Sequence, residues 1–118
     1  MTIAGGSGGG SVNATGDGGS GGGYIYLQAQ SFHNNGTLLS LGGDASKGTD
    51  SGGGSGGTIF ISTYFQEGMG TLDVSGGSAS IDSSNYKPYN PRKGGGAGSG
   101  GRIKLIRFDW FSDDYYKD

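Results

Sequence analysis

Short apolar segments recur along this chain at a regular spacing. Tyr24-Ile25-Tyr26-Leu27 follows the glycine pair 22–23, and Thr58-Ile59-Phe60-Ile61 follows a second pair 34 residues later. A third segment, Arg102-Ile103-Lys104-Leu105, comes after another glycine pair and a further 44 residues. Each segment is short, bounded by glycine and rich in β-branched and aromatic residues, which predicts a strand. Similar segments at such a period predict a repeat architecture, in which each unit buries its apolar face against the next.

A second apolar segment lies between these strands and shares the 34-residue offset. Gly36-Thr37-Leu38 precedes one glycine pair and Gly70-Thr71-Leu72 precedes the next. Alternation along a strand points every second side chain to the same face. The first strands are also followed, at nearly matching places, by Phe32, Phe65 and Phe108, which predict an aromatic stack at a corner. The predicted inward ladder comprises Ile3, Ile25, Leu27, Leu38, Ile59, Ile61, Leu72, Val74, Ile103 and Leu105.

Two arrangements could join these strands. Asn34-Asn35-Gly36 favours a tight hairpin turn and hence antiparallel pairing. A parallel coil instead places like residues on like in every column, with Ile25, Ile59 and Ile103 in one of them. We therefore expect an all-β fold, a parallel β-helix of about three glycine-rich coils with long Gly/Ser connectors.

Glycine placement bears on whether the chain is ordered. Hydrophobic residues make up 31% of the 118 positions and glycine supplies 30, a composition typical of disorder. However, 27 of these glycines lie in the connectors 5–23, 42–57 and 76–101, and such sorting favours an ordered fold. The 30 glycines divide equally among the three phases of a triplet repeat, which argues against a collagen-like or fully polyglycine II fold. Short polyglycine segments within the connectors stay open as an alternative.

The repeat resembles a known family. Gly53-Gly54-Ser55-Gly56-Gly57 before Thr58-Ile59-Phe60-Ile61, the segment from Gly70 to Gly77, and Gly98-Ser99-Gly100-Gly101 before Ile103 are similar to glycine-rich β-helix repeats of large surface proteins in protists and some bacteria. The resemblance covers about residues 2–108. It implies a right-handed parallel β-helix in an extracellular or surface scaffold, with no catalytic residues.

Charge and cysteine content exclude several functions. The net charge of −2 carries no basic stripe, so we expect no nucleic-acid partner. The longest apolar runs are too short to span a bilayer, and we expect no membrane insertion. With no cysteine, disulfides and thiolate metal sites are excluded. The glycine-rich loops lack a Gly-Lys-Ser/Thr ending, so we expect no bound nucleotide or other cofactor.

The polar candidates do not form a catalytic or metal-binding pattern. Asp17, Asp44, Asp50 and Asp73 lie near glycines, but no connector repeats the nonapeptide of calcium β-rolls, and solvated carboxylates explain them better. His33 is the single histidine and has no partner at metal-ligand or triad spacing, which indicates a turn residue. Asp113-Asp114 fits a solvated tail. We therefore expect no enzyme activity.

Two sequons suggest a glycosylated exterior. Asn13-Ala14-Thr15 and Asn35-Gly36-Thr37 both lie in predicted loops, so Asn13 and Asn35 are candidate glycosylation sites. This chain would produce about one sequon by chance, and the pair is weak support.

The last ten residues differ from the rest. We place the repeat domain at 1–108 and an aromatic, acidic tail at 109–118, which forms either a cap over the open coil or an interface. The repeats begin on a second strand and finish on a first strand, so stacking one copy on the next would restore the interrupted unit. The expected interface residues are Thr2, Ile3, Ala4, Ile103, Leu105, Phe108, Trp110, Phe111, Tyr115 and Tyr116.

Assembly is the function that the sequence favours. We expect the protein to form an extracellular or surface filament as a homopolymer joined head to tail through its open ends. The alternative is an adhesin or receptor-binding module, in which the connector 80–93, with Tyr86, Tyr89 and Arg92, contacts carbohydrate or protein.

Overall fold

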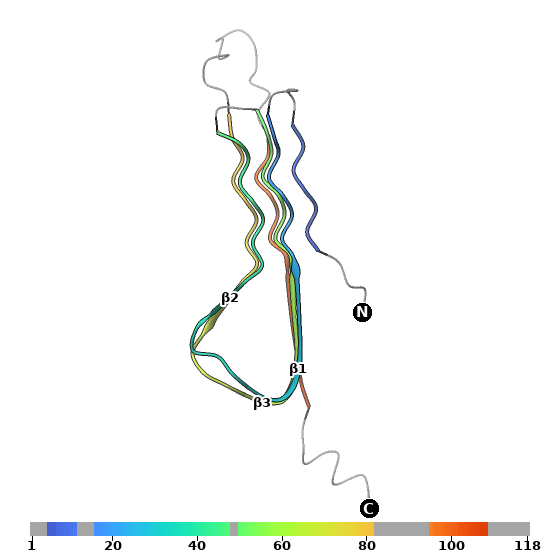
Figure 1. The fold of residues 1–118 in the computed structure, drawn as a ribbon, viewed down its shortest axis with the longest axis vertical. Coiled ribbons are helices and arrows are strands. Elements are labelled where there is room, and N and C mark those ends of the chain that lie inside the picture. Colours follow the sequence, from blue (N-terminus) through green and yellow to red (C-terminus); the bar gives the residue numbers. More distant parts are fainter. Residues whose placement is uncertain (1–4, 12–15, 48–49, 82–94, 109–118) are drawn as a thin grey trace, which may run out of the picture.

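The computed structural model describes residues 5–11, 16–47, 50–81 and 95–108. Its regular elements are all strands, and they lie together at one end of the elongated molecule, while wavy glycine-rich segments fill the other end (Figure 1). The fold is therefore all-β, as expected. The strands are β1 (Tyr24–His33), β2 (Thr37–Leu39), β3 (Thr58–Glu67), β4 (Thr71–Asp73) and β5 (Arg102–Arg107).

The strands form two parallel sheets. One has the order β1-β3-β5 and the other consists of β2 and β4. The register pairs Ile25 with Ile59 and Ile59 with Ile103, and it pairs Leu38 with Leu72. The sequence offsets of 34 residues (β1 to β3, β2 to β4) and 44 residues (β3 to β5) are therefore the registers in which the strands pair. Parallel pairing is confirmed and the hairpin alternative is wrong, because like residues stack on like in this arrangement and would not in the other.

The first strands are longer than predicted because the corner that follows them also stacks. β1 and β3 each have ten residues and pair as far as His33 with Glu67. The pairing continues through the corner, where the amide of Asn34 donates to the Glu67 carbonyl at 3.0 Å. Gly68 has a φ of 109°, a left-handed conformation that favours glycine.

The predicted aromatic stack at this corner is wrong. Phe32 pairs with Gln66, and Phe65 pairs with Ser31, so the two phenylalanines are one residue out of register and point to opposite faces. The ring of Phe108 instead contacts Tyr64, with centroids 5.5 Å apart. A one-residue difference in spacing was enough to separate the rings.

The inward ladder is buried only at its centre. Ile59 and Ile61 on β3 are 0% and 1% exposed because β1 and β5 cover them from both sides. Ile103 and Leu105 on β5, predicted to belong to the same core, are 43% and 47% exposed. The reason is that β5 is an edge strand with no described strand on its outer side. Ile25, Leu27, Leu38, Leu72 and Val74 are half-buried, and Ile3 lies outside the described residues.

The glycine-rich segments form a bundle of their own. They continue the strands upward and run side by side (Figure 1). Their hydrogen bonds recur at every third residue: the amides of Gly19 and Gly22 donate to the carbonyls of Gly52 and Ser55, each at 2.8 Å. We call these segments g1 to g6, and they span residues 5–11, 16–23, 40–47, 50–57, 74–81 and 95–101.

The bundle has the properties of polyglycine II. A polyproline II-type helix has three residues per turn and no internal hydrogen bonds, so its amides and carbonyls point outward to neighbouring chains. The backbone bonds of g1 to g6 join different segments with this period, and of the described glycines only Gly68 has a positive φ. Segments g1 to g6 are therefore helices of this type, the alternative that stayed open for short parts of the connectors, although the equal distribution of glycine over three phases argued against it for the chain as a whole.

Candidate functional site

The centre of the bundle is g4, which has neighbours on five sides. Its amides donate in turn to g1, g6 and g3: Gly52 to Gly10, Gly53 to Gly96 and Gly54 to Gly43, at 2.8 to 3.0 Å. Its carbonyls accept from g2 and g5. Around g4, segments that accept from it alternate with segments that donate to it. Most of g4 is buried, including Ser51, which is 0% exposed.

Glycine is required wherever a neighbour lies. A Cβ on Gly54 would overlap the Ser20 carbonyl of g2, and a Cβ on Gly98 would overlap the Gly54 carbonyl. Ser20 is the equivalent residue of g2, 34 positions before Gly54, but no described segment lies on that side of g2 and the serine is exposed. The side chain marks the flank of the bundle.

A second row of residues follows the same rule. A Cβ on Gly18 or Gly21 of g2 would overlap the backbone of g1. The equivalents in g4 are Gly52 and Ser55. At Gly52 an added Cβ would lie 3.1 Å from its nearest neighbour, and Ser55 carries a hydroxymethyl group. Five segments surround g4, and the side on which a sixth would lie is occupied by the side chain of Ser55.

This sixth position is a shallow polar groove. It has a volume of about 260 Å³ and lies between g1, g4 and g6. Ser55 reaches across it, because its Oγ accepts from the Ser7 amide at 2.7 Å and lies 3.2 Å from the Ser7 carbonyl. The carbonyls of Gly53 and Gly56 have no hydrogen-bond partner among the described residues. Serine thus substitutes for part of the contacts that another glycine-rich segment would make.

Ends of several glycine-rich segments meet at the end of the bundle opposite the sheets. Isolated bridges join Ser11 to Ser51 and Ser51 to Ser80, so the ends of g1 and g5 meet the start of g4. The bundle therefore brings described residues that are distant in the sequence to one tip, opposite the strands (Figure 1). The connector 80–93, with Tyr86, Tyr89 and Arg92, lies mostly outside the described residues.

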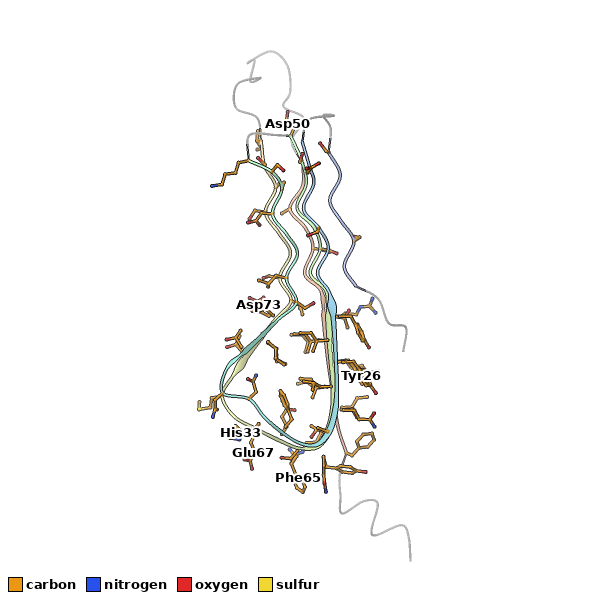
Figure 2. All side chains as sticks on the ribbon, viewed as in Figure 1. Tyr26, His33, Asp50, Phe65, Glu67 and Asp73 are labelled. Carbon is orange, nitrogen blue, oxygen red and sulfur yellow. The ribbon has the colours of Figure 1, made fainter. Side chains whose placement is uncertain are left out.

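The outer face of the large sheet carries an aromatic and cationic ladder. Tyr26 on β1 stacks on Phe60 of β3 with centroids 5.1 Å apart and ring planes 2° apart. Lys104 on β5 places its Nζ 6.0 Å from the Phe60 centroid, a cation–π contact. Figure 2 shows Tyr26 on the outer side of the strands, pointing away from the space between the sheets. The ladder starts with a tyrosine that is 53% exposed and ends with a lysine.

A wider groove lies lower on this face. It has a volume of about 570 Å³ and is lined by Gln28, Gln30, Ser62, Tyr64 and Phe108. Phe108, a predicted interface residue, is 45% exposed there and its amide donates to the Thr63 carbonyl at 2.9 Å. The groove contains no carboxylate or histidine, so its described lining offers no acid–base pair.

His33 is the last residue of β1 and pairs with Glu67 of β3, so the turn interpretation is wrong by one residue: the strand continues up to the corner. Its Nδ1 lies 3.6 Å from Oε2 of Glu67, and its Nε2 lies 2.8 Å from Nδ2 of Asn35. Both side chains are exposed, so their contact contributes little to stability. Figure 2 shows His33 and Glu67 side by side at the corner. Sequence reasoning missed this pair, although the 34-residue offset between positions 33 and 67 could have revealed it.

The acidic candidates have local structural contacts. Asp73 accepts from the amide and the hydroxyl of Ser75 at 2.9 and 2.8 Å, and these bonds lower the pKa of its carboxyl below the usual value. Asp44 accepts from the Ser78 amide at 2.7 Å, which links g3 to g5. Among the described residues no group of three metal-binding side chains gathers.

Several predicted sites fall outside the described residues. They are Asn13, Thr2, Ile3, Ala4, Trp110, Phe111, Asp113, Asp114, Tyr115 and Tyr116. Asn35, the other sequon, is exposed at the corner, where its Oδ1 accepts from the Met69 amide at 3.1 Å. Residues 5–11 follow the strand predicted at the start of the chain, which was expected to stack with β2 and β4. They pair with g2 and g4 and do not extend the stack of g3 and g5.

Comparison with known proteins identifies no relative. No family model, curated protein or solved structure matches the chain. Within the described part of the chain, no helix has the length and apolar character needed to cross a membrane.

Proposed function

We propose that the protein is a structural unit of an extracellular or surface scaffold, a right-handed parallel β-helix that stacks with further units at its open edges. The single observation that carries this proposal is the contrast along one ladder. Ile59 and Ile61 are buried by strands on both sides, whereas Ile103 and Leu105 at the β5 edge are almost half exposed. Covering them with another strand would gain about 1 kcal/mol for each side chain, because a little under half of each is still exposed.

The unpaired edges support the same proposal. β1 and β5 are the outer strands of their sheet, so each has a row of amides and carbonyls that no other described strand pairs. Such an edge is a template for pairing with another chain. Assembly into a filament joins these edges and removes both the unpaired backbone groups and the exposed apolar side chains.

Mass measurements test assembly. We expect light scattering to show a molar mass that rises with protein concentration, and electron microscopy to show filaments. The variant Ile103→Asp/Leu105→Asp should stay monomeric, because the new carboxylates would have to be buried in the joint. Met69→Asp is the control, since Met69 is 97% exposed at the corner and should leave assembly unchanged. A wild-type chain that stays monomeric at all concentrations would contradict the proposal.

A second candidate function is recognition at the tip of the bundle. The observation that favours it is that the ends of g1, g4 and g5 meet there, through the bridges of Ser51 with Ser11 and Ser80. A rigid scaffold that holds several loops at one place is typical of binding modules. Carbohydrate or protein is the expected ligand class.

Loop replacement tests this second function. Residues 82–93 can be exchanged for a short Gly-Ser linker, and the wild-type and exchanged proteins compared on a glycan array and by protein capture from host-cell extracts. Recognition predicts that binding is lost while the circular dichroism spectrum is retained. Equal binding by both proteins would rule out a role for this connector.

A further inference from the structure

We propose that the joint between two copies is a parallel pairing of β5 from one copy with β1 of the next, in the register that places Ile103 beside Ile25. This inference rests on the proposed scaffold function and specifies its partner surface. The register continues the one within the chain, where Ile25 pairs with Ile59 and Ile59 with Ile103. The joint would span Tyr24 to Ala29 on one copy and Arg102 to Arg107 on the other.

The outer columns of the two edges are complementary. Lys104 lies over Phe60 and Phe60 stacks on Tyr26, while Tyr24 of the same strand is the other ring beside Tyr26. Among the described residues, no ring covers the face of Tyr26 from across the β1 edge. In the proposed register Lys104 of a second copy lies against that face, between Tyr26 and its own Phe60. Arg102 would likewise meet Tyr24. A cation placed over an aromatic face is an attractive pair, and arginine and lysine both form it.

The inner columns match as well. Ile103 would cover Ile25, and Leu105 would cover Leu27, so each exposed apolar side chain of β5 meets a half-buried apolar residue of β1. Arg107 would lie opposite Ala29, the one position of this face without a matching pair. Within the chain, the same stacking of aliphatic side chains on aliphatic side chains buries Ile59 and Ile61.

The same edges do not suit pairing of like with like. Two β5 edges would bring Arg102 and Lys104 of both copies together, and like charges in opposite positions are destabilising. The hydrogen bonds of the bundle also run in one direction across the molecule: amides of g2 donate to g4, and amides of g4 donate to g6. The amides of Ala97 and Gly100 in g6 and the carbonyls of Gly18 and Gly21 in g2 have no hydrogen bond to described residues. One flank thus offers donors and the other offers acceptors, so the two flanks of the bundle differ, as the two edges of the sheet do.

The bundle limits the length of this joint. If a second bundle took the place beside g2, the Cβ of Ser20 would overlap the Gly98 carbonyl of the second copy, as a Cβ on Gly54 would overlap Ser20. Asp17 adds a second side chain on this flank. Residues 21–23 are glycines and carry no side chain, so the clash begins at Ser20, inside the bundle and beyond the end of β1. The joint is therefore confined to the β-strand region, and the two bundles diverge beyond it.

Cross-linking tests the register, and the absence of native cysteine gives a clean background. The variants Ile103→Cys and Ile25→Cys are mixed and treated with a bifunctional thiol reagent that spans about 5 Å, the spacing of adjacent strands. We expect a cross-linked dimer from the mixture, a ladder of oligomers from the double variant, and none from either single variant. Ile103→Cys mixed with Leu27→Cys is the control for a shifted register and should react less.

Each outcome separates the joint from the scaffold function. Dimers of Ile103→Cys alone, or stronger reaction in the shifted pair, would overturn the proposed register while light scattering still shows assembly. An absence of any concentration-dependent mass would instead overturn the scaffold function. Both cysteine positions are at exposed or half-buried edge residues, so the variants should fold, which circular dichroism verifies.

Two further variants test the side-chain argument. Lys104→Met should weaken association about two- to five-fold, because it removes the cation and keeps the aliphatic stem. Ser20→Gly should strengthen association, because it removes the obstacle to bundle contact, whereas Ser78→Gly on the exposed face of g5 should have no such effect. Weaker association of Ser20→Gly than of Ser78→Gly would contradict the proposed position of the second bundle.

Discussion

The bundle and the sheets use one register for two opposite packing rules. In the sheets, side chains 34 or 44 residues apart meet, and stability depends on matched shapes such as Ile25, Ile59 and Ile103. In the bundle, backbones meet, and stability depends on the absence of a side chain at residues such as Gly54 and Gly98. The comparison teaches that a glycine in this chain is an interior residue in the same sense as an isoleucine.

The largest effect should come from a single methyl group at the centre of the bundle. Gly54→Ala places a Cβ against the Ser20 carbonyl, which belongs to a backbone that cannot move without losing its own hydrogen bonds. We expect a loss of about 5 kcal/mol or more, comparable with the whole stability of a small domain. Urea denaturation followed by circular dichroism measures it. Gly100→Ala is the matched control, because a Cβ there has nothing within 4 Å, and a similar loss in that variant would refute the packing rule.

The next largest effect should come from truncating a buried side chain in the sheets. Ile59→Ala removes a side chain that is 0% exposed, and we expect the free energy of unfolding to fall by about 2–4 kcal/mol. Ile103→Ala in the same column should cost about 1 kcal/mol or less in the monomer, since its side chain is already 43% exposed. Equal losses in dilute protein would mean that the β5 edge is covered in solution.

A smaller effect is expected where the two regions join. The Ser40 hydroxyl donates to the Gly23 carbonyl at 2.6 Å, and the same carbonyl accepts from the Thr58 amide at 2.9 Å. Ser40→Ala should cost about 0.5–1.5 kcal/mol, because the carbonyl keeps one of its two bonds. Thermal melting compared with the exposed Ser99→Ala variant measures the difference. No difference would show that the hydroxyl does not link bundle to sheet.

The smallest effect is a pH dependence at the end of β4. Hydrogen bonds from Ser75 lower the pKa of Asp73 below its ordinary value of 3.8, so the folded state favours the ionised carboxylate. The stabilisation is present above the unfolded pKa and is lost as pH falls through the folded value. Asp73→Asn should remove this component of the acid-induced decrease in urea midpoint, and a pH profile identical to wild type would contradict it.

The sheets could be predicted from the sequence because their rule has a direct signature. Apolar residues at a fixed offset must stack, and the spacing of Ile25, Ile59 and Ile103 therefore gave both the parallel direction and the register. Burial could not be predicted from the same pattern. Ile103 and Ile59 look equivalent in sequence, and they differ only because one strand has a neighbour on each side.

The sequence left the bundle as an open alternative and did not predict it, for a physical reason. Its triplet rule applies to each segment separately, and the offsets of 34 and 44 residues between segments are not multiples of three. The glycines that face a neighbour therefore change phase from one segment to the next, and a count of glycine by phase over the whole chain shows no triplet preference. A segment with five neighbours, such as g4, also needs glycine in more than one phase. Counting each connector separately and aligning Gly18 with Gly52 would have revealed the pattern.

The scarcity of side chains in the bundle also determines how the protein should respond to temperature. Exposing apolar surface on unfolding raises the heat capacity, whereas exposing polar peptide groups lowers it. The glycine-rich half buries mainly peptide groups, so its unfolding should carry an unusually small heat-capacity change. The stability of that half should vary little with temperature, and it should resist cold denaturation better than a domain of equal size with an apolar core.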